Sequence, residues 1–120
     1  MPVNNEGTSE NIRPWGRYDI LDEGDGFKVK RITVQPSKRL SYQNHKQRSE
    51  FWIMTSGQAR ITLDDVPRDI TQGDTVNIPI GMKHRVENTG DVPTIFIEVQ
   101  MGSYLGEDDI IRYDDDYGRV

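Results

Sequence analysis

Short runs of alternating apolar and polar residues, each ended by a turn signal, make up most of the chain. Alternation with a period of two is typical of strands that bury one face, and no long segment shows the 3.6-residue period of an amphipathic helix. Clusters such as Gly24-Asp25-Gly26 separate the runs. The pattern predicts an all-β sandwich or barrel. Its expected strands are Tyr18–Leu21, Phe27–Val34, Arg39–Gln43, Glu50–Thr55, Ala59–Leu63, Thr75–Ile78, His84–Glu87 and Thr94–Gln100.

The two ends of the chain depart from this strand pattern. Residues 1–12 are polar and patternless, which predicts a flexible N-terminal arm ahead of one domain over residues 13–120. The string Arg13-Pro14-Trp15-Gly16 begins the ordered part, because it combines turn residues with a large aromatic anchor. Near the other end, Gly106–Arg112 is the segment that we expect to form a short helical turn.

The composition restricts the partners of the protein. A net charge of −5 argues against a nucleic-acid partner, since neutralising phosphates needs a basic face. The acidic runs Glu107-Asp108-Asp109 and Asp114-Asp115-Asp116 are expected to be solvated or hydrogen-bonded, with a metal or partner site as the alternative. The chain has no cysteine, which excludes disulfides and thiolate metal sites. Its apolar fraction of 33% is low, and burial against a second copy, in a homodimer, would suit so modest a core.

No apolar stretch approaches the ~20 residues of a membrane span. The N-terminus also lacks the apolar core of a signal peptide. We therefore expect a cytoplasmic protein without membrane contact.

Alternation also places several polar side chains on inward faces. Ser41, Gln43 and His45 share one side of their strand, since side chains at i and i+2 point the same way. Along Arg48–Met54, Arg48 and Glu50 share a side with the large apolar residues. Gln43, His45 and Glu50 can therefore meet inside a barrel.

The spacing of these polar residues resembles the two motifs of the cupin superfamily. The first motif reads Ser37, Gln43-Asn44-His45, Glu50 and Gly57, with Ser and Gln where the family commonly has Gly and His. The second reads Gly73, Pro79-Ile80-Gly81, His84 and Asn88, and matches at every position. The resemblance implies a single cupin barrel, a double-stranded β-helix or jelly roll.

It also implies one divalent metal ion bound by Gln43, His45, Glu50 and His84. An amide oxygen, a carboxylate and two imidazoles suit Zn²⁺, Mn²⁺, Fe²⁺, Co²⁺ or Ni²⁺. A barrel that has lost its metal is the alternative.

A closer resemblance extends over residues 13–119. The strings Leu40-Ser41-Tyr42-Gln43-Asn44-His45 and Tyr104-Leu105-Gly106-Glu107-Asp108-Asp109-Ile110 are similar to the C-terminal cupin domain of bifunctional mannose-1-phosphate guanylyltransferase/mannose-6-phosphate isomerases. The isomerase half of that activity converts mannose 6-phosphate to fructose 6-phosphate through an enediol. Three histidines of the relatives' first motif are replaced here by Lys46, Gln47 and Phe51.

The resemblance and the required chemistry assign further roles. Arg48, Lys30 and Glu98 are candidate catalytic residues, although Arg48 and Lys30 could be surface cations and Glu98 an exposed strand carboxylate. A phosphosugar also needs cationic contacts for its phosphate. Arg39, Lys46 and Arg112 are the candidates for that role, with an ordinary surface position as the alternative.

Three functions remain open at this point. The first is a metal-dependent sugar-phosphate isomerase. The second is a cupin that binds metal and a phosphosugar, or another small anion, without turnover, which the three replaced histidines favour. The third is a metal-dependent oxygenase, against which Gln43 argues because such sites usually resemble three histidines and one glutamate.

Overall fold

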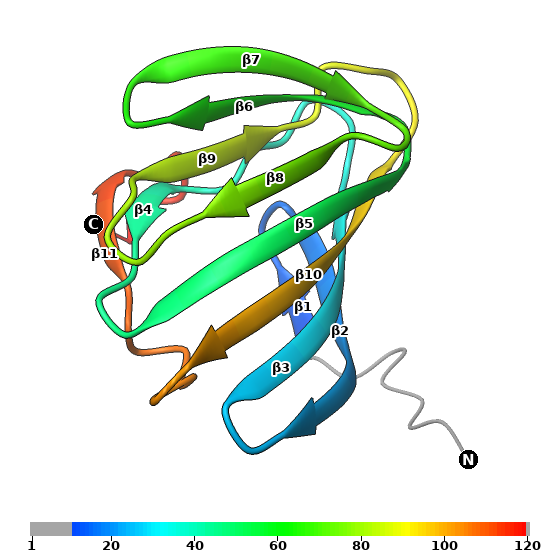
Figure 1. Cartoon of the computed structure of the whole chain (residues 1–120). Coiled ribbons are helices and arrows are strands. Elements are labelled where there is room, and N and C mark those ends of the chain that lie inside the picture. The colour runs from blue at the N-terminus through cyan, green and yellow to red at the C-terminus, as the bar shows by residue number, and fades with distance from the viewer. Residues whose placement is uncertain (1–10, 120) are drawn as a thin grey trace.

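Two antiparallel sheets face each other across a flattened barrel in the computed structural model, which describes residues 11–119 (Figure 1). One sheet has six strands in the order β1-β2-β3-β10-β5-β8, and the other has five in the order β11-β4-β9-β6-β7. The strands are β1 (Ile12–Arg13), β2 (Gly16–Gly24), β3 (Phe27–Val34), β4 (Tyr42–Asn44), β5 (Arg48–Ser56), β6 (Gln58–Leu63), β7 (Val66–Thr71), β8 (Thr75–Ile78), β9 (His84–Glu87), β10 (Thr94–Gly102) and β11 (Ile111–Asp114).

Strand alternation decides which side chains enter the barrel. In β5, Arg48, Glu50, Trp52 and Met54 are buried while the residues between them are half-buried or exposed, as the sequence pattern predicted. Strand β10 alternates in the same way and turns Glu98 inward. The apolar residues of these faces belong to one buried core. Its members are Trp15, Ile32, Val34, Trp52, Met54, Ala59, Ile61, Ile70, Val76, Ile78, Val86 and Phe96.

The interior of the barrel is apolar in one part and polar in another. The Trp52 ring lies 4.6 Å from that of Phe96 and meets the ring of His84 edge-on at 5.8 Å. Trp52 therefore separates the apolar core from a group of buried polar residues. Because every strand turns one face inward, both the core and the polar group lie on ordinary strand positions.

The all-β barrel expected from the sequence is confirmed, and three edge elements differ from the expectation. Strand β7 was not expected from the sequence. It carries Pro67 and is almost entirely exposed at a sheet edge, where a strand does not need alternating apolar and polar residues. Strand β1 is only two residues long. The stretch Gly106–Arg112 forms one turn, in which Asp109 N donates to Gly106 O at 3.2 Å. The chain then enters β11 rather than a helix.

Most of the expected arm over residues 1–12 lies outside the described residues. Its last residue, Ile12, pairs with Arg17 of β2. Within residues 11–119, no helix is long and apolar enough to cross a membrane.

Asn88 joins the ends of three segments. Its side-chain amide donates to Val34 O at 2.9 Å and to Val92 O at 2.8 Å, and its Oδ1 accepts from Gly90 N at 2.8 Å. The side chain is fully buried. Every polar atom of this buried amide is thus engaged, which is what a buried polar group needs to avoid a desolvation penalty.

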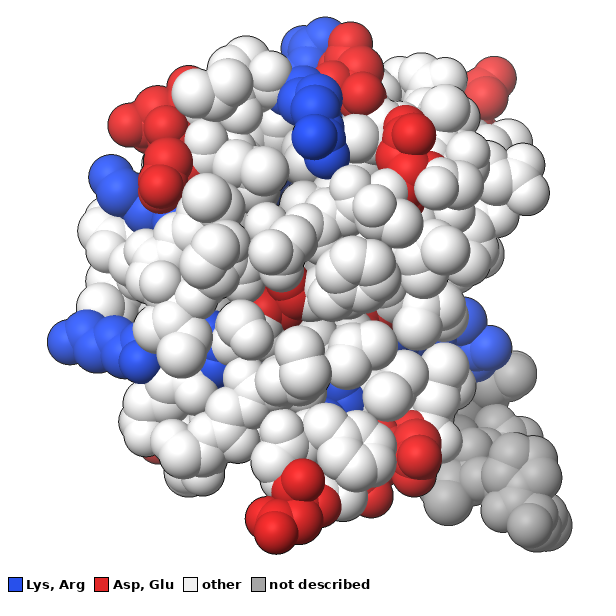
Figure 2. Space-filling view, viewed as in Figure 1, with Lys and Arg blue, Asp and Glu red and all other residues white. Residues whose placement is uncertain are grey.

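The outer side of the six-stranded sheet is apolar over β10 and β5, and beside this stretch β2 and β3 carry the ion-paired Arg17, Asp19 and Arg31. Val99 of β10 lies between Val29 of β3 and Phe51 of β5, and the next row pairs Ile97 with Ile53. Phe51 and Ile53 are each 40% exposed. Figure 2 looks onto this side of the molecule and shows mostly uncharged residues across it, with charged residues mainly toward the edges.

We predict that Asn88→Asp lowers the free energy of unfolding by about 2–4 kcal/mol, because a carboxylate oxygen would replace the amide that donates to two buried carbonyls. Urea denaturation followed by circular dichroism measures the change. Asn77→Asp on the exposed side of β8 is the matched control, expected within about 0.5 kcal/mol of the unsubstituted protein. Equal losses for the two variants would contradict the role of Asn88.

The homodimer expected from the sequence stays a prediction, and the outer side of β10 and β5 is where we expect the second copy to pack. The apolar stretches of two copies can oppose each other there without bringing like charges together. Light scattering after size exclusion is expected to give a dimer, and Val99→Lys a folded monomer. Gln72→Lys, in the exposed turn after β7, is expected to remain dimeric. If the unsubstituted protein is a monomer at working concentration, the prediction of a homodimer is wrong.

Candidate functional site

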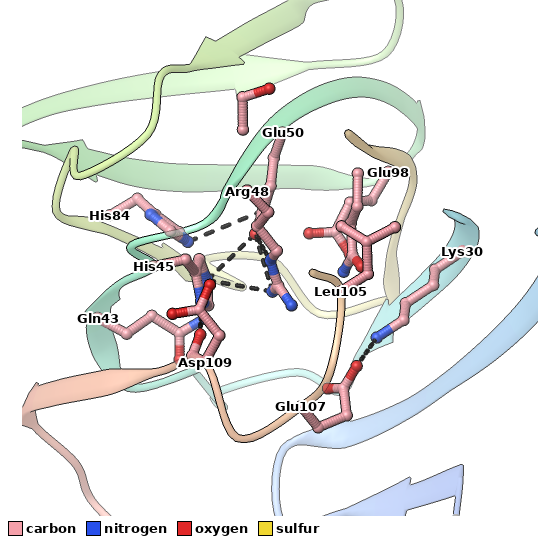
Figure 3. A network of polar contacts seen from close by, with 12 residues as sticks. Lys30, Gln43, His45, Arg48, Glu50, His84, Glu98, Leu105, Glu107 and Asp109 are labelled. Carbon is pink, nitrogen blue, oxygen red and sulfur yellow. Dashed lines mark hydrogen bonds and ion pairs between the residues drawn. The ribbon is translucent and has the colours of Figure 1, made fainter. Parts of the chain in front are cut away.

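Two histidines and one glutamate converge in the polar part of the barrel. His45 follows β4, Glu50 lies on β5 and His84 begins β9, and all three side chains are buried. His45 Nε2 lies 3.1 Å from Glu50 Oε2, and His84 Nε2 lies 3.9 Å from Glu50 Oε1. One potential ligand atom from each residue falls within 4.8 Å of the others. Figure 3 shows the three side chains pointing toward one another.

Backbone carbonyls orient both imidazoles. His45 Nδ1 lies 2.6 Å from the carbonyl oxygen of Asp109, and His84 Nδ1 lies 3.0 Å from that of Met82. A carbonyl can only accept, so each Nδ1 carries the proton and each Nε2 keeps its lone pair. Burial lowers the pKa of His84, which favours the neutral ring. Both Nε2 lone pairs therefore face the Glu50 carboxylate, the arrangement that metal-binding histidines commonly show.

Glu50 is the anion at the centre of this group. Arg48 Nε donates to Glu50 Oε2 at 3.0 Å, Arg48 Nη2 lies 2.9 Å from the same oxygen, and Trp52 Nε1 donates to Oε1 at 2.9 Å. Burial acts to raise the pKa of Glu50, but a hydrogen bond with Glu98 and the positive charge of Arg48 hold that pKa well below its ordinary value. Glu50 is therefore a carboxylate at neutral pH.

The donor set fits a divalent metal ion. Ligand atoms about 2.1 Å from a metal stand about 3.0–3.4 Å from each other. The separation of His45 from Glu50, 3.1 Å, lies in this range, and that of His84 from Glu50, 3.9 Å, is somewhat longer. The Nε2 atom of His84 is buried without a hydrogen-bond partner among the described residues, so its lone pair is available. Arg48 Nη2 also lies 3.1 Å from His45 Nε2. A cation thus already faces two of the three groups, and a metal ion would have to displace that guanidinium.

Gln43, the fourth predicted ligand, lies beside the cluster. It pairs across strands with His84 and lines the same cavity. Its Oε1 accepts a hydrogen bond from Ser41 Oγ at 2.6 Å, which leaves one lone pair on the amide oxygen. The structure therefore brings all four predicted ligands together, Glu50 from the six-stranded sheet and the other three from the side of the five-stranded sheet.

The cavity also holds Lys30 and Glu98, which are cross-strand partners on β3 and β10, in the same sheet as Glu50. Both are buried, so the interpretations of Lys30 as a surface cation and of Glu98 as an exposed carboxylate are wrong. Arg48 is buried too, and it is likewise no surface cation. Burial and the nearby charge of Glu50 raise the pKa of Glu98 well above its ordinary value. Glu98 Oε1 also accepts from Gln100 Nε2 at 3.2 Å.

The segment between β10 and β11 supplies two residues that the sequence pattern missed. Glu107 forms an ion pair with Lys30 at 2.7 Å, visible at the edge of the cavity in Figure 3. Asp109 accepts from the backbone N–H groups of Lys46 and Gln47 at 2.9 Å each, and its own carbonyl holds His45. The acidic run of the sequence was the available signal, since one of its expected uses was hydrogen bonding.

The three predicted phosphate contacts separate in space. Arg39 lies outside the cavity, where its guanidinium bonds both carboxylate oxygens of Asp116 at 2.8 and 2.9 Å. Lys46 is exposed and does not line the cavity. Arg112 of β11 does line it, together with the metal-type cluster. The cavity has a volume of about 80 Å³.

Comparison with known proteins is consistent with this arrangement. The family model described as mannose-6-phosphate isomerase C-terminal matches residues 4–115. The xanthan biosynthesis protein XanB of Xanthomonas campestris pv. campestris (strain B100) is 52% identical over 108 residues, which cover 90% of this chain and 23% of the relative. A mannose-1-phosphate guanylyltransferase of Salmonella montevideo is 48% identical over 110 residues, or 92% of this chain and 23% of the relative. The chain thus spans about a quarter of the length of these curated relatives.

Among solved structures, a cupin 2 conserved barrel domain protein from Salinispora arenicola CNS-205 superimposes with a TM-score of 0.68 and 24% sequence identity. The match covers 86% of this chain and 90% of that protein, and it supports the barrel fold. With the family model matching nearly the whole length, the chain belongs to the mannose-6-phosphate isomerase C-terminal family and has the cupin fold.

Proposed function

We propose that the protein is a metal-dependent aldose–ketose isomerase that interconverts mannose 6-phosphate and fructose 6-phosphate. The observation that carries the proposal is the pair of imidazole lone pairs directed at the buried carboxylate of Glu50, in a cavity that also holds the buried Lys30 and Glu98. The family match supports this choice of reaction. The guanylyltransferase activity in the name of the Salmonella montevideo relative is not part of the proposal, because the chain spans only 23% of that protein's length.

His45, Glu50 and His84, with Gln43 beside them, would hold one divalent ion. When bound, that ion polarises the carbonyl and hydroxyl oxygens at C1 and C2 of the sugar and makes the neighbouring C–H more acidic. Arg48, displaced from the ligand atoms, would remain within reach to donate hydrogen bonds to the same sugar oxygens. Lys30 would donate from β3, which lines the same cavity.

Glu98 is the proposed proton carrier. In its deprotonated form, which its raised pKa makes a stronger base, it takes the proton from C2 of the aldose, the enediol forms, and the same proton is returned to C1 while the O2 proton passes to O1. Glu98 lies on the strand next to that of Glu50, so it would stand beside a sugar bound at the ligand cluster. Trp52 and Phe96 close the apolar end of the cavity, which limits the access of water during the transfer.

The binding module without turnover is the second candidate, and it drew its support from the three replaced histidines. Lys46, Gln47 and Phe51 all have exposed side chains that do not line the cavity. Histidines at those positions would therefore point away from the substrate. This placement favours the isomerase over the binding module.

Mannose 6-phosphate turnover is predicted to require metal and His84. Protein supplied with Mn²⁺, Zn²⁺ or Co²⁺ should interconvert the two sugar phosphates, lose activity with a chelator and regain it with metal. His84→Ala should lose bound metal and about 10³-fold in kcat/KM, because it removes a ligand of the ion that polarises the substrate. Asn77→Ala is the control for both metal content and rate. Stoichiometric metal binding without turnover for any of the ions would refute the isomerase and leave the binding module.

Glu98→Gln is predicted to lower kcat by about 10²–10⁴-fold, since the amide cannot accept the proton from carbon. Metal content, measured by mass spectrometry, should stay unchanged because Glu98 is not one of the proposed ligands. Glu23→Gln, at an exposed position of β2, is the matched control. If Glu98→Gln keeps its kcat, another group must carry the proton.

A further inference from the structure

We propose that Arg112, flanked by Arg13 and Arg119, forms the subsite for the phosphate group of the substrate, a small phosphorylated sugar. The inference rests on the proposed function for the nature of the sugar, but the anion-binding site itself is argued from the arrangement of cations in the cavity.

Arg112 lies in line with the proposed metal ligands. It pairs with Gln43 across β11 and β4, and Gln43 pairs with His84 across β4 and β9. Directly opposed residues on neighbouring antiparallel strands have Cβ atoms about 4.5–5.5 Å apart and point to the same side. Arg112 is therefore two strand spacings, or ~10 Å, from His84 on the same face. One extended sugar phosphate can reach from the ligand cluster to this guanidinium.

Arg112 is the cation of this wall that the protein leaves uncompensated. Within residues 11–119 it has neither a salt bridge nor a hydrogen bond from its side chain, and its Nε is buried without a partner. Burial lowers its pKa, and the positive charges of Arg119 and Arg13 lower it further, with Asp115 acting in the opposite direction. Like charges gathered around a half-buried guanidinium are unfavourable unless an anion joins them.

The two flanking arginines are held in place by groups other than Arg112. Arg13 donates to the hydroxyl of Tyr18 at 3.1 Å and stacks over that ring. Arg119 bonds both carboxylate oxygens of Asp115 at 2.8 Å, and this contact lowers the pKa of Asp115 to about 2. A guanidinium has five N–H donors, so Arg119 retains donors for an anion while Asp115 fixes its position.

The whole cavity has the charge that a phosphosugar requires, although the chain is acidic. Six cationic residues line it against three carboxylates, in a protein of net charge −5. Two of these carboxylates, Glu50 and Glu107, are occupied by Arg48 and Lys30. The cationic lining residues are Arg13, Lys30, Arg48, Arg85, Arg112 and Arg119.

The test separates phosphate binding from turnover. Inorganic phosphate is titrated by calorimetry into metal-free protein, so that binding to a metal ion cannot contribute. Arg112→Gln should weaken phosphate binding at least about tenfold, because it removes a bidentate cationic donor. Arg39→Gln, which removes an arginine paired outside the cavity, should change it by less than about twofold.

Kinetics of the metal-loaded protein give the second readout. Arg112→Gln should raise KM for mannose 6-phosphate at least about tenfold and lower kcat much less, and Arg112→Lys should recover part of the loss, since an ammonium keeps the charge without the planar fork. Arg112→Lys also serves if the glutamine variant does not fold.

Phosphate affinity and KM unchanged in both Arg112 variants would overturn the subsite even if the protein is an isomerase. Phosphate binding that depends on Arg112 in a protein without mannose 6-phosphate turnover would support the subsite and remove the isomerase.

Discussion

The buried carboxylate of Glu50 is the group on which the arrangement of the site depends. An ion withdrawn from water costs several kcal/mol unless hydrogen bonds and opposite charge replace the lost hydration. Here Arg48 and Trp52 donate to its two oxygens, and the positive charge of Arg48 lies against the carboxylate. Removing any donor would leave the charge undercompensated, so the side chains around Glu50 are fixed to one another as well as to the barrel.

This polar centre limits how the rest of the barrel can be built. The volume given to charged groups cannot contribute apolar burial, so the stability must come from the core beyond Trp52 and from fully satisfied polar groups such as Asn88. Gly57 shows a similarly strict requirement at a turn. Its φ is +81°, and a Cβ there would stand 2.7 Å from Pro93 O, so only glycine allows this close approach. A barrel with a charged interior thus depends on strict local requirements at positions such as Asn88 and Gly57.

Side-chain parity could be predicted from the sequence wherever strands have one buried face. It placed Gln43, His45 and Glu50 inward correctly, and it placed Phe51 outward. It failed at the edges. Strand β7 has no buried face to produce alternation, and β11 takes its position from pairing with β4, about 70 positions earlier in the chain, which no local pattern encodes. Asp109 and Glu107 were missed as site residues for the same reason, since their partners His45 and Lys30 are distant in sequence.

The same limitation explains why three cations of similar appearance in the sequence have different surroundings. Arg39, Lys46 and Arg112 were equivalent candidates, because a charge on a polar segment gives no indication of what faces it. The C-terminal segment decides between them. It brings Asp116 to Arg39 on the outer surface and Arg112 to the cavity beside Gln43.

Net charge is therefore a poor guide to the ligand of this protein. The C-terminal carboxylates neutralise Arg39, Arg85 and Arg119 in ion pairs, yet no carboxylate bonds Arg112 among the described residues. An acidic chain can in this way keep a local excess of positive charge in a sheltered cavity, where the field is less screened than at the surface. The position of the last strand, rather than the composition, determines that the cavity favours an anion.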